Sequence, residues 1–505
     1  MLKKRYRTLK IFVFICASAI LTVGYIEASP GNAANLILNW QMEEARRVMD
    51  GLDDVPPQLE GLYSFYMGDY EKACEGFSRS PESFPRMYNI TAKLAPLRKK
   101  FEFTESRYFK IYSAGRDRVM ALYAGEILDS AAENLKQHFG YIPSRKKVIL
   151  EIYPDKESFQ TASTLTDEQM KASGAVGICK FNRLMVSSPA VLKFGYRWAD
   201  TITHEYVHYI IGKITGLENM PLWLNEGLAR YYEQSWENKS GEFTPHEKNL
   251  LYLNRQDNIW VRLEKMKYGM PNLDDRDEVS LAYAQVHSMV DYMTKEYDSG
   301  IAGKLLYELA DKNADEAFKD ILKLSVEDFF SRWQDYIARK DIPYSKGAAG
   351  ANYAFKDDPV NAVTEWVSQT AATDIYLARR FIKRERYSLA KRKYRDALDK
   401  NPGNSVILNE LARAEKKTGE TEKAEKYFLK AIENNPHYAP PFKHLGDFYL
   451  EMKDYSLAEN YLKRYLYIQP FDPAVHRFLK ELYSRQGEDK LKDKEEKALE
   501  ILNES

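Results

Sequence analysis

Small, apolar and proline positions in the C-terminal third of the chain recur with a fixed period of 34 residues. Small residues let two antiparallel helices approach closely, larger apolar residues fill the space between them, and proline ends a helix. The pattern therefore predicts stacked helical hairpins over residues 374–486. The positions that keep the period are Ala390, Ala424 and Ala458, then Pro402, Pro436 and Pro470, then Leu411, Leu445 and Leu479.

This period and these residue types resemble the tetratricopeptide repeat, a helical hairpin that stacks into an all-α solenoid. Such solenoids bind protein segments, so the resemblance implies a protein partner on the repeats. Residues 341–373 begin with DIPYSKGAAGANY, a composition typical of a linker, and are expected to hold the first helix of the repeat region as well. Residues 487–505 are expected to form a charged helix or tail.

A related pattern occurs near the N-terminus in LEGLYSFYMGDYEKACEGF, where Gly61, Gly68, Tyr70 and Ala73 occupy helix-hairpin positions. One hairpin cannot bury its apolar face alone. We therefore expect a small helical domain over residues 33–99, built either from repeat-like hairpins or from an unrelated helical pair.

Between the helical ends, β-branched and aromatic residues form three runs of strand length, at residues 106–114, 147–153 and 180–187. Residues 117–139 have helical apolar spacing, and after Asp200 the pattern is mainly helical to about Lys340. The sequence thus predicts an α+β domain over residues 106–340, with a strand-rich N-terminal part and a helical C-terminal part.

The 505-residue chain has 74 basic and 74 acidic side chains, so its formal net charge is zero. Nucleic-acid-binding proteins usually carry a basic excess, so no nucleic-acid partner is expected. A hydrophobic fraction of 44% with 29% charged residues excludes a disordered or collagen-like chain. Three cysteines are too few for a disulfide scaffold or a cysteine-rich zinc site.

The N-terminus has the layout of a targeting segment. MLKKRYRTLK carries five positive charges and no acid, and it precedes the uncharged run IFVFICASAILTV. The run is shorter than the ~20 residues that span a membrane comfortably. Residues 1–28 are therefore expected to be a signal peptide with Ala28 as a candidate cleavage position, or else a retained membrane anchor. In both cases the rest of the chain is exported, to the periplasm or another extracytoplasmic space.

The segment ADTITHEYVHYIIGKITG has helical spacing and contains an H-E-x-x-H motif formed by His204, Glu205 and His208. Residues at i and i+4 share one helix face, so the two imidazoles can bind one metal ion with Glu205 beside it. The alternative is a pair of histidines that serves helix packing, which needs no third ligand nearby.

A third ligand follows in PLWLNEGLA, where proline suits the first turn of a second helix. Gly216 separates the two helices and Gly227 removes bulk between them. Glu226 can then face the metal ion held by His204 and His208. This donor set leaves one position of a tetrahedral zinc ion open for water, which is the catalytic arrangement. The alternative for Glu226 is a surface or helix-pairing carboxylate.

The HEYVH motif, seventeen intervening residues and the glutamate of WLNEGLA together resemble the gluzincin metallopeptidases, especially the bacterial peptidase MA-like family. Members of that family often carry tetratricopeptide repeats. The resemblance spans residues 106–340 and implies a gluzincin-type domain with one zinc ion per chain. Gluzincin aminopeptidases hold the substrate's amino terminus with a glutamate in G-x-M-E-N, whereas the comparable GAVGI here has no acid. An endopeptidase is therefore favoured.

Several other residues have candidate roles in such a site. Glu205 is expected to act as the general base toward a zinc-activated water. Tyr283 and His287, at i and i+4 on a later helix, are candidate oxyanion donors, with ordinary helix packing as the alternative. Asn225 could orient Glu226 or its neighbours. Asp200 could orient the His204 imidazole, although a helix N-cap is the favoured role for it.

Two functions follow from these features. The first is an exported zinc-dependent metallopeptidase that hydrolyses peptide bonds in a peptide or protein substrate. The alternative is a non-catalytic scaffold or assembly protein with a vestigial zinc site. The retained Glu205 and the open metal position favour the enzyme, because a structural site needs neither.

Overall fold

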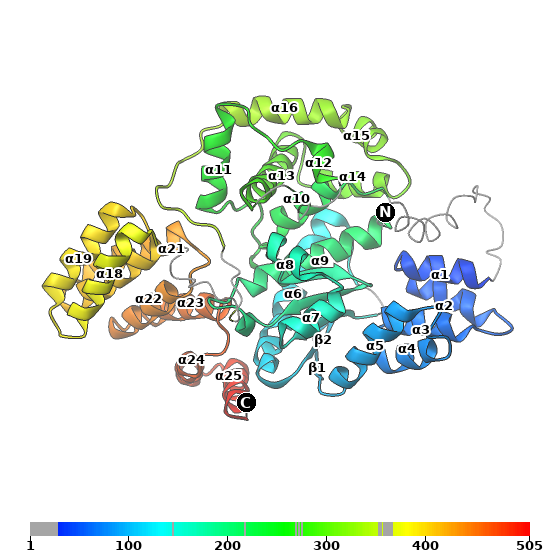
Figure 1. Ribbon diagram of the computed structural model, residues 1–505, viewed down its shortest axis with the longest axis horizontal. Helices are drawn as coiled ribbons and strands as arrows, with labels where there is room; N and C mark the ends of the chain where they lie inside the picture. The colour runs from blue at the N-terminus through cyan, green and yellow to red at the C-terminus, as the bar shows by residue number, and fades with distance from the viewer. Residues whose placement is uncertain are drawn as a thin grey trace, which may run out of the picture.

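The computed structural model has a mixed α/β centre flanked by two helical parts (Figure 1). It describes residues 29–504 except 144–145, 217–218, 268–269, 271–272, 274–275, 352–355 and 357–366. The expected signal peptide or anchor, residues 1–28, and much of the expected linker therefore lie outside the described residues. Within the part that is described, no helix is both long and apolar enough to cross a membrane.

The centre is built on one five-stranded sheet with the strand order β1-β2-β3-β5-β4. The three inner strands run parallel, and each edge strand is antiparallel to its neighbour. The strands are β1 (Glu102–Glu105), β2 (Phe109–Ser113), β3 (Val148–Tyr153), β4 (Gly177–Lys180) and β5 (Arg183–Ser187).

The sequence wrongly predicts one continuous strand over residues 180–187. Phe181 and Asn182 both have positive φ, 55° and 61°, and this two-residue turn reverses the chain. The segment is therefore the end of β4, a tight turn and β5. As a result β4 forms the edge of the sheet opposite β1, while β5 is an inner strand.

Helices α6 (Arg118–Phe139) and α9 (Trp198–Thr215) cover one face of the sheet. Phe109 of β2 contacts Tyr206 of α9 edge to face, with ring centroids 4.9 Å apart. Alternate residues of a strand point to opposite faces, so Glu151 and Tyr153 of β3 point away from these helices. The remaining helices of the central part are α7 (Lys156–Ser163), α8 (Asp167–Ser173), α10 (Leu222–Tyr232), α11 (Pro245–Arg255), α12 (Leu263–Met266), α13 (Arg276–Glu296), α14 (Ile301–Leu309), α15 (Ala314–Leu322) and α16 (Val326–Arg339).

The N-terminal helices lie at the other face of the sheet and meet it through a buried charge network. Tyr70 and Tyr153 each donate a 2.6 Å hydrogen bond to the Glu151 carboxylate. Arg98 Nη1 lies 2.9 Å from Glu151 Oε1, and Arg183 Nε lies 3.4 Å from Oε2. These helices are α1 (Pro30–Leu38), α2 (Met42–Asp50), α3 (Pro57–Tyr66), α4 (Tyr70–Ser78) and α5 (Pro85–Arg98).

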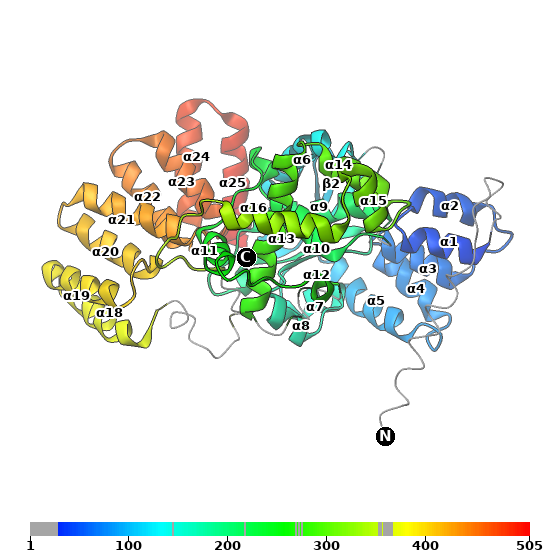
Figure 2. The same ribbon diagram turned by 90° about the horizontal axis from the view of Figure 1, so that it is seen from above.

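The C-terminal part is a stack of helical hairpins that extends away from the sheet (Figure 2). The periodic alanine and leucine positions of the sequence are fully buried between the helices. Helices α18 and α19 lie farthest from the sheet, whereas α25 packs against α6. The helices are α18 (Gln369–Ile382), α19 (Tyr387–Lys400), α20 (Ser405–Lys417), α21 (Thr421–Asn434), α22 (Pro440–Glu451), α23 (Tyr455–Leu466), α24 (Pro473–Gln486) and α25 (Asp489–Glu504).

The buried network at Glu151 gives a stability prediction. Glu151→Gln leaves two guanidinium groups without their counter-charge in a buried site, so we expect the free energy of unfolding to fall by about 3–5 kcal/mol. Urea unfolding measures this change. Glu105→Gln is the matched control, because Glu105 is 41% exposed in its pair with Lys147, and it should leave the free energy of unfolding almost unchanged. Equal losses in the two variants would contradict the prediction.

Candidate metal centre

Two consecutive helices bring the candidate metal ligands together. His204 and His208 lie one turn apart on α9, which ends at Gly216 with a positive φ of 65°. Glycine adopts this left-handed backbone without strain, so the chain can leave the helix there. Helix α10 begins after Pro221 and carries Glu226.

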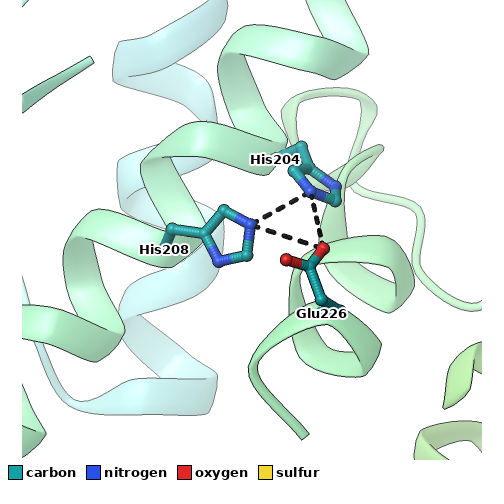
Figure 3. A group of neighbouring side chains, drawn as sticks. All are labelled: His204, His208 and Glu226. Atoms are coloured by element: carbon teal, nitrogen blue, oxygen red, sulfur yellow. Dashed lines mark hydrogen bonds and ion pairs between the residues drawn. The ribbon is translucent and has the colours of Figure 1, made fainter. Parts of the chain in front are cut away.

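Figure 3 shows the two imidazoles and the Glu226 carboxylate pointing toward one another. The two Nε2 atoms are 3.1 Å apart, and Glu226 Oε2 lies 3.7 Å from the His204 nitrogen and 3.8 Å from the His208 nitrogen. Ligands held 2.0–2.1 Å from a tetrahedral ion are about 3.3 Å apart. Among the described residues, this is the single group of three or more such side chains that could hold a metal ion.

The far side of each imidazole contacts an acceptor that orients the ring. Asn225 Oδ1 lies 2.8 Å from His208 Nδ1, and Glu233 Oε2 lies 3.6 Å from His204 Nδ1. With Nδ1–H directed at the Asn225 amide oxygen, the lone pair of His208 Nε2 is left for a metal ion. Asn225 therefore contacts the candidate ligand His208, where the sequence suggested Glu226 or its neighbours. Glu233 is a residue that sequence reasoning missed.

Glu233 starts a chain of alternating charges that leads away from His204. Arg230 Nη1 donates to both Glu233 carboxylate oxygens at 2.6 Å, and its Nε donates to Glu247 Oε1 at 3.0 Å. Glu247 Oε1 in turn lies 3.2 Å from His287 Nδ1. The Arg230–Glu233 spacing of i,i+3 was readable in the sequence, but only the fold shows that Glu247 faces the same arginine.

His287 is thus held in a fixed orientation by its neighbours. Its ring stacks on Phe243 with centroids 3.9 Å apart, and it is 1% exposed. Its Nε2 atom is buried without a hydrogen-bond partner among the described residues. Tyr283 lies one turn earlier on α13 and is partly buried.

Glu205 is buried beside the edge strand β4. A Cβ atom at Gly177 would lie 2.8 Å from Glu205 Oε1 and 2.8 Å from Thr201 Cγ2, so a larger residue there would displace the Glu205 carboxylate. The backbone amide of Cys179 donates to the Glu205 carboxylate. Burial nevertheless raises the pKa of Glu205 to about 7, which suits a proton acceptor at neutral pH.

Two smaller expectations from the sequence are wrong. Gly227 does not relieve the α9–α10 contact, because a Cβ atom there would lie 2.8 Å from the Val286 carbonyl oxygen of α13. Asp200 is neither the N-cap of α9 nor a partner of His204. Its carboxylate accepts a 2.9 Å hydrogen bond from the Trp236 indole and pairs with Arg197.

The protonation of the two candidate histidine ligands follows from their burial and from the charges around them. Burial alone lowers the pKa of His204, but the carboxylates of Glu226 and Glu233 raise it to about 10. Burial lowers the pKa of His208 below its ordinary value. Without a metal ion, the site thus holds one positive charge on His204 among its carboxylates.

Comparison with known proteins now adds the family. Residues 130–339 match the model of the Peptidase MA superfamily. The chain carries a Peptidase MA superfamily domain. Residues 377–439 and 444–472 match tetratricopeptide repeat models, so the Peptidase MA domain is followed by repeats as the sequence predicts. The α+β fold class with an all-α repeat solenoid is confirmed.

Whole-chain comparisons add no further information. No curated protein matches the chain. Among solved structures, the crystal structure of MamA is 18% identical, with a TM-score of 0.24, over 28% of this chain and 82% of that one. The crystal structure of the APC/C hetero-tetramer Cut9–Hcn1 is 13% identical, with a TM-score of 0.24, over 94% of this chain and 82% of that one. Such low scores support no argument about fold or function.

The protonation state gives a prediction for metal binding by the Peptidase MA domain. His204 must lose its proton before Nε2 can bind a metal ion, so binding at pH 7.5 should release about one proton, and affinity should rise with pH below the His204 pKa of about 10. Calorimetry in two buffers of different ionisation enthalpy measures the released proton. A binding heat that is the same in both buffers would contradict the prediction.

Proposed function

We propose that this chain is an exported zinc-dependent metallopeptidase that cleaves internal peptide bonds, with repeats that recruit a protein partner or substrate. The observation that carries the proposal is the convergence of His204, His208 and Glu226 next to the buried carboxylate of Glu205. The match of residues 130–339 to the Peptidase MA superfamily model supports the same chemistry.

The three side chains fit zinc in donor type and in spacing. Two imidazole nitrogens and one carboxylate oxygen form a catalytic donor set, in contrast to the closed and usually cysteine-rich structural sites. Their separations of 3.1–3.8 Å suit ligands of a common ion. When bound, zinc supplies Lewis-acid chemistry that acidifies water and polarises a carbonyl group.

Glu205 then moves the proton. As an ionised carboxylate it accepts a proton from the attacking water, and it delivers that proton to the leaving amine nitrogen. Its burial, together with the close approach of Gly177, keeps the carboxylate in one place beside the ligands. A pKa near neutrality lets the same group act first as base and then as acid.

The negative charge that develops on the carbonyl oxygen needs a donor from the protein. His287 and Tyr283 are the two candidates. The ionised Glu247 carboxylate only accepts, so His287 Nδ1 carries the hydrogen between them. Nε2, which has no partner among the described residues, can then donate only when the imidazole is doubly protonated. Measuring kcat for His287→Gln and for Tyr283→Phe distinguishes the two candidates. Substitution of the residue that donates to the oxyanion should lower kcat more than substitution of the other.

The substrate is proposed to lie as an extended segment along β4. This strand ends the sheet, so its outer backbone groups can pair with a peptide and place little demand on side chains. Gly177 brings this strand directly against Glu205. The absence of an acid over residues 174–178 favours an endopeptidase over an aminopeptidase.

Export is proposed from the sequence alone, because the positive and apolar segments lie within residues 1–28. Either a cleaved signal or a membrane tether would place the catalytic domain outside the cytoplasm. The N-terminal residue of the mature protein distinguishes these two forms, and cytoplasmic retention of the full chain would contradict both.

The central prediction is the loss of activity in Glu205→Gln. The amide cannot accept the proton of water, so we expect kcat to fall about 10²–10⁴-fold on a peptide substrate. Zinc content should stay at that of the unaltered chain, because Glu205 is not a ligand. A fluorogenic peptide assay together with elemental analysis measures both quantities.

Glu296→Gln is the matched control, because it makes the same chemical change on the exposed end of α13 and should leave kcat unchanged. Chelation should abolish activity and added zinc should restore it. Unchanged turnover in a folded, zinc-loaded Glu205→Gln sample would refute the proposed mechanism and favour a scaffold function.

A further inference from the structure

The repeats contact the metal-binding helix at its first residue. The Trp198 backbone amide donates to the Tyr467 carbonyl oxygen at 3.1 Å, and the Trp198 indole donates to the Leu466 carbonyl oxygen at 2.9 Å. The first amides of a helix and the last carbonyls of a helix have no partner within their own helix. Here the first amide of α9 donates to a carbonyl oxygen at the end of α23, so each group has a hydrogen-bond partner from the other helix.

Aromatic packing closes this junction. The Tyr467 ring lies edge to face with both Trp198 and Trp236, at centroid distances of 6.0 and 4.8 Å. Trp198 is fully buried, and the Trp236 indole donates to Asp200 in the first turn of α9. The contact therefore encloses the first turn of the helix from two sides.

The backbones of the two parts also meet directly next to α9. Gly195 has a positive φ of 68°, and a Cβ atom at this position would lie 2.4 Å from the Ile468 carbonyl oxygen. No side chain other than hydrogen fits in this space unless the repeat backbone or the segment before α9 moves. The two parts are therefore packed at backbone contact distance three residues before Trp198.

A second repeat segment faces the residues that orient His204. His437, between α21 and α22, has its Nδ1 buried without a hydrogen-bond partner among the described residues. Burial, together with the nearby charges of Arg197 and Arg230, lowers its pKa to about 3. Arg230 is the same residue that holds Glu233 beside His204.

We propose that the hairpin α22–α23 is a positioning element of the metal centre, which sets the place of His204 through Trp198. The effect on metal affinity rests on the proposed function, because it requires that His204 binds zinc. Trp198 and His204 are six residues apart, about 9 Å along the helix axis. Metal ligands must be held to within about 0.5 Å, so a shift at the first turn reaches the centre. Whatever displaces this hairpin, including a protein segment bound to the repeats, then changes metal affinity.

Gly195→Ala in the full chain tests the proposal. The added methyl group should separate α9 from the repeats, weaken zinc binding about tenfold in a chelator competition, and speed deuterium uptake over residues 198–204. Gly487→Ala is the matched control, because Gly487 has a similar φ of 73° but open space around its Cβ position. This control should lose similar backbone stability and keep wild-type zinc affinity and deuterium uptake over residues 198–204.

A second pair of variants, with smaller changes, tests the proposal in case Gly195→Ala does not fold. Trp198→Phe removes the indole donor to Leu466 and part of the ring that packs on Tyr467. Trp260→Phe makes the same change at an indole that donates to Asn258, away from the repeats. We expect weaker zinc binding and faster exchange over residues 198–204 for the first variant alone. Wild-type zinc affinity and wild-type exchange in folded Trp198→Phe and Gly195→Ala would overturn the proposal.

The two readouts separate this proposal from the proposed function. If the unaltered chain binds no zinc, the metallopeptidase proposal fails, and exchange over residues 198–204 still decides whether the hairpin holds α9. If zinc binds but exchange and affinity are unchanged in both variants, the positioning proposal alone fails.

Discussion

Helix α9 is buried on almost all sides, and yet it must keep the polar side chains of His204, Glu205 and His208 in defined orientations and protonation states. Thirteen of its eighteen residues are buried, so the sheet, α6, α10 and the repeats can meet on it. Burial is costly for Glu205 and for the ligand histidines unless each has a defined partner. The surrounding structure supplies these partners: the Cys179 amide for Glu205, Asn225 for His208, and Glu233 for His204.

These partners are connected to one another. Glu233 is held by Arg230, which also contacts Glu247, and Glu247 fixes His287. Because opposite charges alternate along the chain, each buried group stabilises its neighbour, and removal of one leaves an unpaired charge. The same arrangement links His204, a candidate metal ligand, to a candidate oxyanion donor on another helix. The site is therefore a cooperative unit and not a set of independent residues.

Local patterns in the sequence were enough to predict that His204, His208 and Glu226 lie together, since this depends on helix periodicity and on one inter-helix turn. The sheet edge was not predictable from the same evidence, because KFNRLMVS reads as one strand until Phe181 and Asn182 are seen with positive φ. The sequence pairs Gly227 with α9, whereas the structure places α13 against it. A glycine in a sequence indicates a close approach by another element but does not identify that element. Glu233 and the contact between Trp198 and Tyr467 join residues through the tertiary fold, which leaves no local pattern.

The claim that most of the account depends on is that one zinc ion is held by His204, His208 and Glu226. X-ray absorption at the zinc edge of the purified full chain tests it directly. The account predicts one zinc per chain, with two imidazole nitrogens and carboxylate or water oxygens at about 2.0–2.2 Å and no sulfur at about 2.3 Å. It also predicts loss of the zinc in His208→Ala. Absence of zinc from folded protein after zinc loading, or a sulfur ligand, would contradict it.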